Sequence, residues 1–263
     1  MHPFLPLVLA ALTIVLGVSA QSVNWVQYIN PTDRYDAAVG VCTFGDYLAV
    51  VGVVNGEFNE VGAVVGRYFV ALLNRATSEV VKTWIGERGW FFDCLSVGDR
   101  LYVVGGNGIY IFDKGLDVVK KVETNASAAI TFDGNYLYLA GHILKDVNGD
   151  GDSEWIWRVE KRTLNLDLVA YREFYREWEW DQEYRYISFV YDIAINPTTG
   201  ELWVTGEWRI IPKTAGFRIH RSLLVIFDRE LNVKRIVEYQ GGDYNSPGRP
   251  YGICFDKEGN AYV

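Results

Sequence analysis

The sequence has few of the residues and motifs that mark several common classes of protein. It contains one methionine and three cysteines, and no two of these cysteines form a CxxC pair, so a zinc or dithiol redox site has no support. Lys and Arg number 25 against 33 Asp and Glu, which gives a net charge of −8. A nucleic-acid-binding surface needs a basic footprint, so we expect no nucleic-acid partner and no attraction to anionic membranes.

Long apolar runs are confined to the N-terminus. Residues Phe4–Val18 are almost all apolar, and the small residues up to Ala20 resemble a signal-peptide cleavage site. We therefore expect a signal peptide at 1–20 and a secreted or cell-surface domain at 21–263, with an uncleaved anchor as the alternative. No later segment approaches the roughly 20 apolar residues of a membrane span, so the mature chain is predicted to have none.

The three cysteines fall in similar places. Cys42, Cys94 and Cys254 each lie in the first strand of a predicted unit, and Cys42 and Cys254 share the contexts VGVC and YGIC. An odd count in an exported chain raises the alternatives of a free thiol or an intermolecular bridge. We expect instead small apolar residues buried in inner strands.

One pattern recurs through the whole sequence. Residues Ala128–Gly141, AAITFDGNYLYLAG, read as two short strands around a tight turn, and similar stretches begin at residues 39, 92, 191 and 251. Aromatic and β-branched residues, which suit strands, are abundant. A hairpin repeated at this interval predicts an all-β fold, a β-propeller of four-stranded antiparallel blades.

Four complete units can be delimited. Their strands are expected at 37–44, 47–52, 67–73 and 79–84; at 92–97, 100–105, 108–112 and 117–122; at 127–132, 135–140, 155–160 and 166–172; and at 188–195, 201–206, 222–227 and 232–239. A fifth unit begins at Pro250 and stops at Val263. Because an unfinished blade leaves backbone groups unpaired, we expect a truncated fifth blade, completed by missing sequence or by a partner.

Two known families resemble parts of the chain. The segment Pro250–Val263, PYGICFDKEGNAYV, resembles the half-repeat of NHL-type (SBBP-type) extracellular β-propellers. The segment Leu73–Trp84, LNRATSEVVKTW, is weakly similar to the turn of PQQ-type blades, but their docking Trp and its Gly are missing from units two to four. Such propellers include binding scaffolds, lactonases, lyases and dehydrogenases, so the resemblance implies an architecture and not an activity.

The predicted loops are unequal at the two ends of the propeller. The first and third turns of each unit are short, whereas long insertions are expected at 53–66, 142–154, 173–186, 207–221 and 240–249. Long ordered loops are usually functional because the fold does not need them. We therefore expect the long-loop end to bind the ligand, with drift of surface loops as the alternative.

The segment Asp146–Glu154, DVNGDGDSE, has oxygen-bearing side chains at alternate positions. This D-x-N-x-D-G-x-x-E spacing resembles the calcium loops between strands of integrin-type propellers. The resemblance implies a structural Ca²⁺ that would stiffen the loop, and a polar turn is the alternative. The implied ligands are Asp146, Asn148, Asp150, the Asp152 carbonyl and Glu154.

The segment Tyr171–Tyr186 alternates aromatic and charged residues. Trp178 and Trp180, with Trp208 in the next insertion, could form a stacking platform for a glycan or peptide. The alternative is a strand extension whose rings pack on neighbouring blades.

Candidates for catalysis are few. Asp93 and Asp192 share one position near the predicted axis and could bind a cation or act as bases, or they could bond to backbone amides; His142 lies near a long loop. No Gly-x-Ser-x-Gly, Walker or HExxH motif occurs. We therefore expect a secreted module that binds an extracellular protein or glycan. The alternatives are a hydrolase, lyase or quinone-type dehydrogenase acting at the channel mouth, or an incomplete gene product without a function of its own.

Overall fold

Every element in the described part of the chain is a β-strand. The computed structural model describes residues 29, 32, 34–58, 64–106, 108–147, 149, 151–175, 184–212, 219–239 and 249–263, so the predicted signal peptide lies outside it. Within these residues no helix is both long and apolar enough to cross a membrane.

The first two sheets are four-stranded antiparallel meanders in which each strand pairs with the next. Sheet one contains β1 (Tyr35–Phe44), β2 (Tyr47–Phe58), β3 (Val64–Asn74) and β4 (Val80–Arg88). Sheet two contains β5 (Phe91–Val97), β6 (Arg100–Gly105), β7 (Gly108–Phe112) and β8 (Val118–Glu123).

The next two sheets repeat this meander, and a hairpin follows them. Sheet three contains β9 (Ala129–Phe132), β10 (Leu137–Lys145), β11 (Glu154–Arg162) and β12 (Leu168–Phe174). Sheet four contains β13 (Tyr184–Ile195), β14 (Leu202–Pro212), β15 (Ile219–Phe227) and β16 (Val233–Tyr239). The hairpin contains β17 (Cys254–Phe255) and β18 (Ala261–Tyr262).

In the third and fourth sheets and the hairpin, an acidic or polar side chain stabilises the turn between the first and second strands. In the turn after β9, Asp133 Oδ1 accepts hydrogen bonds from the amides of Asn135 at 2.8 Å and Tyr136 at 2.7 Å. Gly134 between them has a φ of +98°, a backbone conformation that glycine adopts without a steric penalty. The tight turns expected at this end of each unit are therefore local features of the sequence.

Both faces of each inner strand are buried, which explains why these strands read as continuous apolar runs. In β6, Leu101 and Val103 pack against sheet one, whereas Tyr102 and Val104 pack against sheet three. Successive side chains of a strand point to opposite faces. A sheet with a neighbour on each side therefore needs apolar residues at every position.

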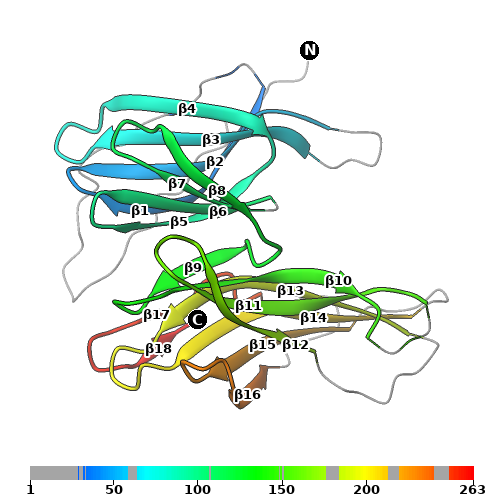
Figure 1. Ribbon diagram of the computed structural model, residues 1–263. Helices are drawn as coiled ribbons and strands as arrows, with labels where there is room; N and C mark the ends of the chain where they lie inside the picture. The colour runs from blue at the N-terminus through cyan, green and yellow to red at the C-terminus, as the bar shows by residue number, and fades with distance from the viewer. Residues whose placement is uncertain are drawn as a thin grey trace, which may run out of the picture.

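The sheets pack face to face in chain order (Figure 1). Separate apolar clusters join sheet one to two, two to three, three to four, and four to the hairpin. Consecutive four-stranded meanders that pack in this way are the blades of a β-propeller, so the predicted fold is confirmed, and sheets one to four are blades 1 to 4. A single parallel pairing of Trp155 with Ile187 also links blades 3 and 4.

Several segments predicted to be long loops are continuations of strands. β2 runs to Phe58 and β3 begins at Val64, while β13 and β14 stay paired from Tyr184↔Pro212 onwards. The expectation of loops across 53–66 and 207–221 was therefore wrong for most of these residues. The two strands of a hairpin satisfy each other's backbone hydrogen bonds. A hairpin can therefore extend beyond the blade without an apolar pattern, and the sequence then gives no sign of the extension.

The turns between third and fourth strands hold a leucine in the left-handed region. Leu116, Leu166 and Leu231 have φ between 55° and 68° and are at most 2% exposed. Each packs in the cluster that joins its own blade to the preceding one. A non-glycine residue in this conformation costs about 1–2 kcal/mol, which burial of a leucine, worth about 1.5–3 kcal/mol, offsets. These turns thus fasten consecutive blades.

We expect Leu231→Ala to lower the free energy of unfolding by about 2–5 kcal/mol, because it leaves a cavity between blades 3 and 4 while the backbone strain remains. Urea denaturation measures this change. Ser78 supplies the control: it has the equivalent φ of 63° in blade 1 but lies outside these clusters, so Ser78→Ala should change stability by less than about 0.5 kcal/mol. Equal losses in the two variants would contradict this role.

Candidate functional site

Asp93 lies on β5 beside the third blade. A β-bulge between Phe91 and Asp93 turns the carboxylate so that it accepts hydrogen bonds from two backbone amides, that of Cys94 at 2.7 Å and that of Ile130 in β9 at 3.0 Å. The second bond joins blade 2 to blade 3. Of the two predicted roles, the geometry corresponds to the bonding of backbone amides.

Asp192 occupies the same position in blade 4. It follows a bulge in β13 and accepts hydrogen bonds from the amides of Ile193 and, in the fifth repeat, Ile253, both at 2.7 Å. Burial raises the pKa of Asp93 to about 7, with a smaller contribution from the charge of Asp192, and raises the pKa of Asp192 to about 6. Both carboxylates therefore hold blades together at a cost in desolvation.

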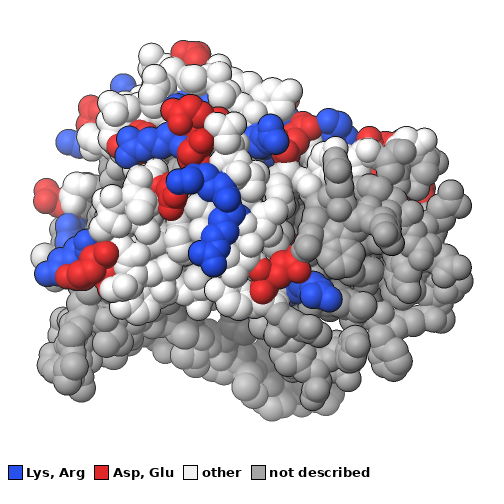
Figure 2. All heavy atoms as spheres, turned by 90° about the horizontal axis from the view of Figure 1, so that it is seen from below, with Lys and Arg blue, Asp and Glu red and all other residues white. Residues whose placement is uncertain are grey.

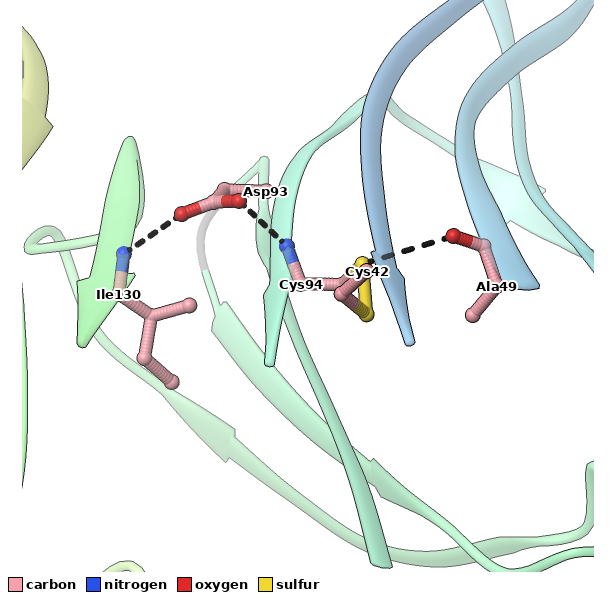
Figure 3. The surroundings of a disulfide bond; sticks show 5 residues. All are labelled: Cys42, Ala49, Asp93, Cys94 and Ile130. Atoms are coloured by element: carbon pink, nitrogen blue, oxygen red, sulfur yellow. Dashed lines mark hydrogen bonds between the residues drawn. A yellow bond between two sulfur atoms is a disulfide. The ribbon is translucent and has the colours of Figure 1, made fainter. Parts of the chain in front are cut away.

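A disulfide joins blades 1 and 2 directly beside Asp93. Cys42 on β1 is bonded to Cys94 on β5, with their Cα atoms 5.8 Å apart, while Cys254 is exposed and unbonded. Figure 3 shows Cys94 bonded to Cys42 on one side while its amide donates to Asp93 on the other. The prediction of three buried apolar cysteines was wrong, because the first strands of neighbouring blades lie close enough for a bond.

His142 and Phe189 begin a polar and aromatic cluster at the long-loop end of blades 3 and 4. The His142 ring lies edge-on to Trp155 and Phe189, with centroids 5.0 and 5.2 Å away, and the Arg209 guanidinium lies 4.8 Å from the Phe189 centroid. Burial lowers the pKa of His142, so the imidazole is held neutral. Its Nδ1 and the Nε of Arg209 are buried and find no hydrogen-bond partner among the described residues.

Glu207 continues the cluster towards the fifth repeat. The residue is 1% exposed, and its carboxylate accepts hydrogen bonds from the Tyr191 hydroxyl and Arg209 and lies 3.5 Å from Arg249 Nε. Arg249 donates to the Tyr251 hydroxyl at 2.9 Å, and the Tyr251 ring lies 4.9 Å from that of Tyr191. We call His142, Phe189, Glu207, Arg209, Arg249 and Tyr251 the mouth cluster.

Sequence reasoning found His142 but missed the rest of the mouth cluster. A signal was present: His142 and Glu207 each follow the glycine that ends the repeated hairpin, Gly141 and Gly206. At this position blades 1 and 2 have Val53 and Gly106. A comparison of the repeats position by position would therefore have marked blades 3 and 4 as the polar side of this end.

The structure does not gather the proposed catalytic residues. Among the described residues, which include Asp93, Asp192 and His142, no three His, Cys, Asp or Glu side chains form a group that could hold a metal ion. The two aspartates are instead occupied by backbone amides of neighbouring strands.

The predicted calcium loop is described in part, since Asn148 and Asp150 lie outside the described residues. Asp146 accepts hydrogen bonds from the amides of Gly149 at 2.6 Å and Gly151 at 3.0 Å. Glu154 is 7% exposed and accepts one from Val147 at 3.3 Å. The loop therefore curls around the first and last carboxylates of the motif.

The predicted aromatic platform is not formed by the residues that can be seen. Trp208 is 4% exposed, so it is a buried residue of β14. Tyr171 on β12 is exposed and lies under the Arg158 guanidinium at 4.1 Å. Trp178 and Trp180 fall outside the described residues, so both the platform and the alternative of rings packed on neighbouring blades stay predictions for this stretch.

Charges of both signs are interspersed on the side of the molecule drawn in Figure 2. Basic and acidic side chains lie next to one another over its described surface. No extended basic field is seen in the described part of this view, which agrees with the net charge of −8.

No protein-family model and no curated protein matches the chain. Among solved structures, it is similar to the WD40 domain of Pan2 from Neurospora crassa, at 10% identity and a TM-score of 0.47, over 84% of this chain and 56% of that one. The chain thus spans little more than half the length of that structure. Other similar structures are a chain of the mitotic checkpoint complex (11% identity, TM-score 0.43, 95% of this chain and 94% of that one) and the computationally designed Ika8 protein (8% identity, TM-score 0.43, 87% and 70%). The NHL-type and PQQ-type resemblances stay predictions.

The disulfide gives a measurable contribution to stability. Cys94→Ala should lower the free energy of unfolding by about 2–5 kcal/mol, because the bond closes a loop between residues 52 positions apart and so restricts the unfolded chain. Thermal unfolding with and without a reductant measures the effect. Cys254→Ala removes an exposed thiol and should change nothing. A wild-type protein whose unfolding is indifferent to reductant would contradict the bond.

Proposed function

We propose that this β-propeller is a secreted module that binds an extracellular protein or glycan through the long-loop end of blades 3 and 4 and the fifth repeat. The observation that carries the proposal is the mouth cluster. It places a buried carboxylate, an exposed tyrosine ring and polar atoms that have no partner among the described residues at one end of the blades. Buried polar groups are almost always paired, so such atoms at a rim indicate a place where another molecule can bind.

The opposite end supports this choice, because its polar groups are already used to join blades. The Tyr102 hydroxyl donates to the Leu164 carbonyl at 3.0 Å, and the Tyr138 hydroxyl to the Arg229 carbonyl at 3.4 Å. Lys120 reaches the Asn165 carbonyl at 2.6 Å in the same way. Each of these acceptors lies in a turn of the following blade, so these turns serve the fold.

Export to an oxidising compartment is part of the proposal. The disulfide between Cys42 and Cys94 supports it, since such bonds persist outside the reducing cytosol. The apolar N-terminal run supports it independently.

A structural calcium ion in the 146–154 loop is the third part. Asp146 and Glu154 both turn their carboxylates into the loop, which fits a set of oxygen ligands for a hard cation. Asp146, Asn148, Asp150, the Asp152 carbonyl and Glu154 would hold the ion and stiffen the extended β10–β11 hairpin.

Calcium in excess over a chelator should raise the thermal unfolding midpoint. At a free calcium concentration one hundred times the dissociation constant, the free energy of unfolding should rise by roughly 2.7 kcal/mol. Asp146→Asn should abolish the shift because it removes a charged ligand. Asp152→Asn should keep it, because that residue contributes its carbonyl. Equal midpoints with calcium and chelator would exclude the ion.

Binding to arrays of defined oligosaccharides and extracellular peptides tests whether the long-loop end is the binding surface. Tyr251 is 62% exposed at the mouth cluster, so Tyr251→Ala should weaken any ligand that the wild-type protein retains, by about tenfold for the loss of one stacked ring. Lys257 in the opposite end's last turn has a side chain 90% exposed, and Lys257→Ala should leave binding unchanged. Loss of binding only in Lys257→Ala would place the site at the wrong end.

A further inference from the structure

Two buried nitrogen atoms without partners flank one aromatic ring. Within the part of the chain that the structure describes, His142 Nδ1 and Arg209 Nε have no hydrogen-bond partner. Both side chains contact Phe189, at 5.2 and 4.8 Å. Leaving such a group unsatisfied costs about 1–3 kcal/mol. The two atoms come from blades 3 and 4. The unsatisfied hydrogen-bonding groups therefore lie at the contact between these blades.

The charges around this ring favour an anion. The mouth cluster contains two guanidinium groups, of Arg209 and Arg249, against one carboxylate, of Glu207. Burial lowers the pKa of His142, so its ring adds hydrogen-bonding capacity and no charge at neutral pH. The Nε–H of Arg209 is a donor and never an acceptor, so a group that completes this site must offer an oxygen acceptor.

We propose that the mouth cluster binds the carboxylate of an acidic saccharide, with the guanidinium groups of Arg209 and Arg249 facing the carboxylate and the ring of Tyr251 stacking on the sugar. This inference rests on the proposed function and names the ligand class for that same end. Arginine is suited to the role because its planar donors match the two oxygens of a carboxylate.

A sugar acid fits the surroundings better than an acidic peptide. Peptides are commonly held by pairing with an open strand edge or by apolar anchors in a pocket, and acidic peptides also by clusters of arginine, so the distinction rests on the rings. Here the groups next to the guanidinium groups are flat rings: Phe189 under Arg209, and Tyr251, exposed and packed on Tyr191. Aromatic faces beside a few oriented polar groups are what a pyranose ring with a carboxylate can use.

Isothermal titration calorimetry with an oligogalacturonide, and with the neutral galactose oligosaccharide of the same linkage, tests the proposal. The wild-type protein should bind the uronate about tenfold or more tightly than the neutral sugar, as expected for hydrogen bonds to a charged group. Arg249→Ala should remove that preference, whereas Arg249→Lys should keep part of it because the charge remains. Arg249 is 38% exposed at its side chain, so its replacement should spare the fold, which thermal unfolding checks.

Arg235 on β16 is an exposed arginine away from the cluster, and Arg235→Ala is the matched control that should bind as the wild type does. The ligand class is overturned if the neutral sugar binds equally well, if a glutamate-rich peptide binds in place of the uronate, or if Arg249→Ala keeps the preference. In the first two cases the proposed binding end survives, provided that Tyr251→Ala weakens binding. If no saccharide and no peptide binds, both proposals fail.

Discussion

The structure depends on the burial of both faces of every blade. A four-stranded sheet with one neighbour would need apolar residues at alternate positions only. β6 and β10 lie between two neighbours, and each has an unbroken run of buried residues, 101–105 and 137–141. Burial of this kind is worth about 25 cal/mol per Å² of apolar surface. It therefore ties the stability of each blade to the presence of the next one and sets the order of the blades along the chain.

One position of the repeat, near the start of the first strand, makes a different connection to the next blade in different blades. Blade 2 has Asp93 bonded forward to Ile130, and blade 4 has Asp192 bonded forward to Ile253. Blade 1 has Gly40 there, where a Cβ atom would lie 2.9 Å from the Phe92 carbonyl oxygen, and is fastened by the disulfide two residues later. Aspartate, with its desolvation cost, is thus found where a carboxylate can reach an amide of the next blade.

The two ends of the propeller follow from this packing. At one end, short turns insert leucines and accept hydrogen bonds from the preceding blade, so they are constrained by the fold. At the other end the hairpins extend beyond the blades, and β11 and β13 meet there. At this end, packing between blades does not require an apolar side chain at every position. This freedom is why His142 and Glu207 can stand where blades 1 and 2 have Val53 and Gly106.

The sequence alone determined the strands and their grouping, because continuous apolar runs and short glycine-containing turns are local and recur in every unit. The apolar N-terminal run and the D-x-N-x-D-G-x-x-E spacing could also be recognised from the sequence, since both are contiguous patterns. Only the tertiary structure decided the partner of Cys94, the buried state of Trp208 and the meeting of His142, Phe189, Arg209 and Arg249. These depend on which strand ends come together in space. Residues far apart in the sequence, such as Cys42 and Cys94, which are 52 positions apart, leave no local pattern that predicts their contact.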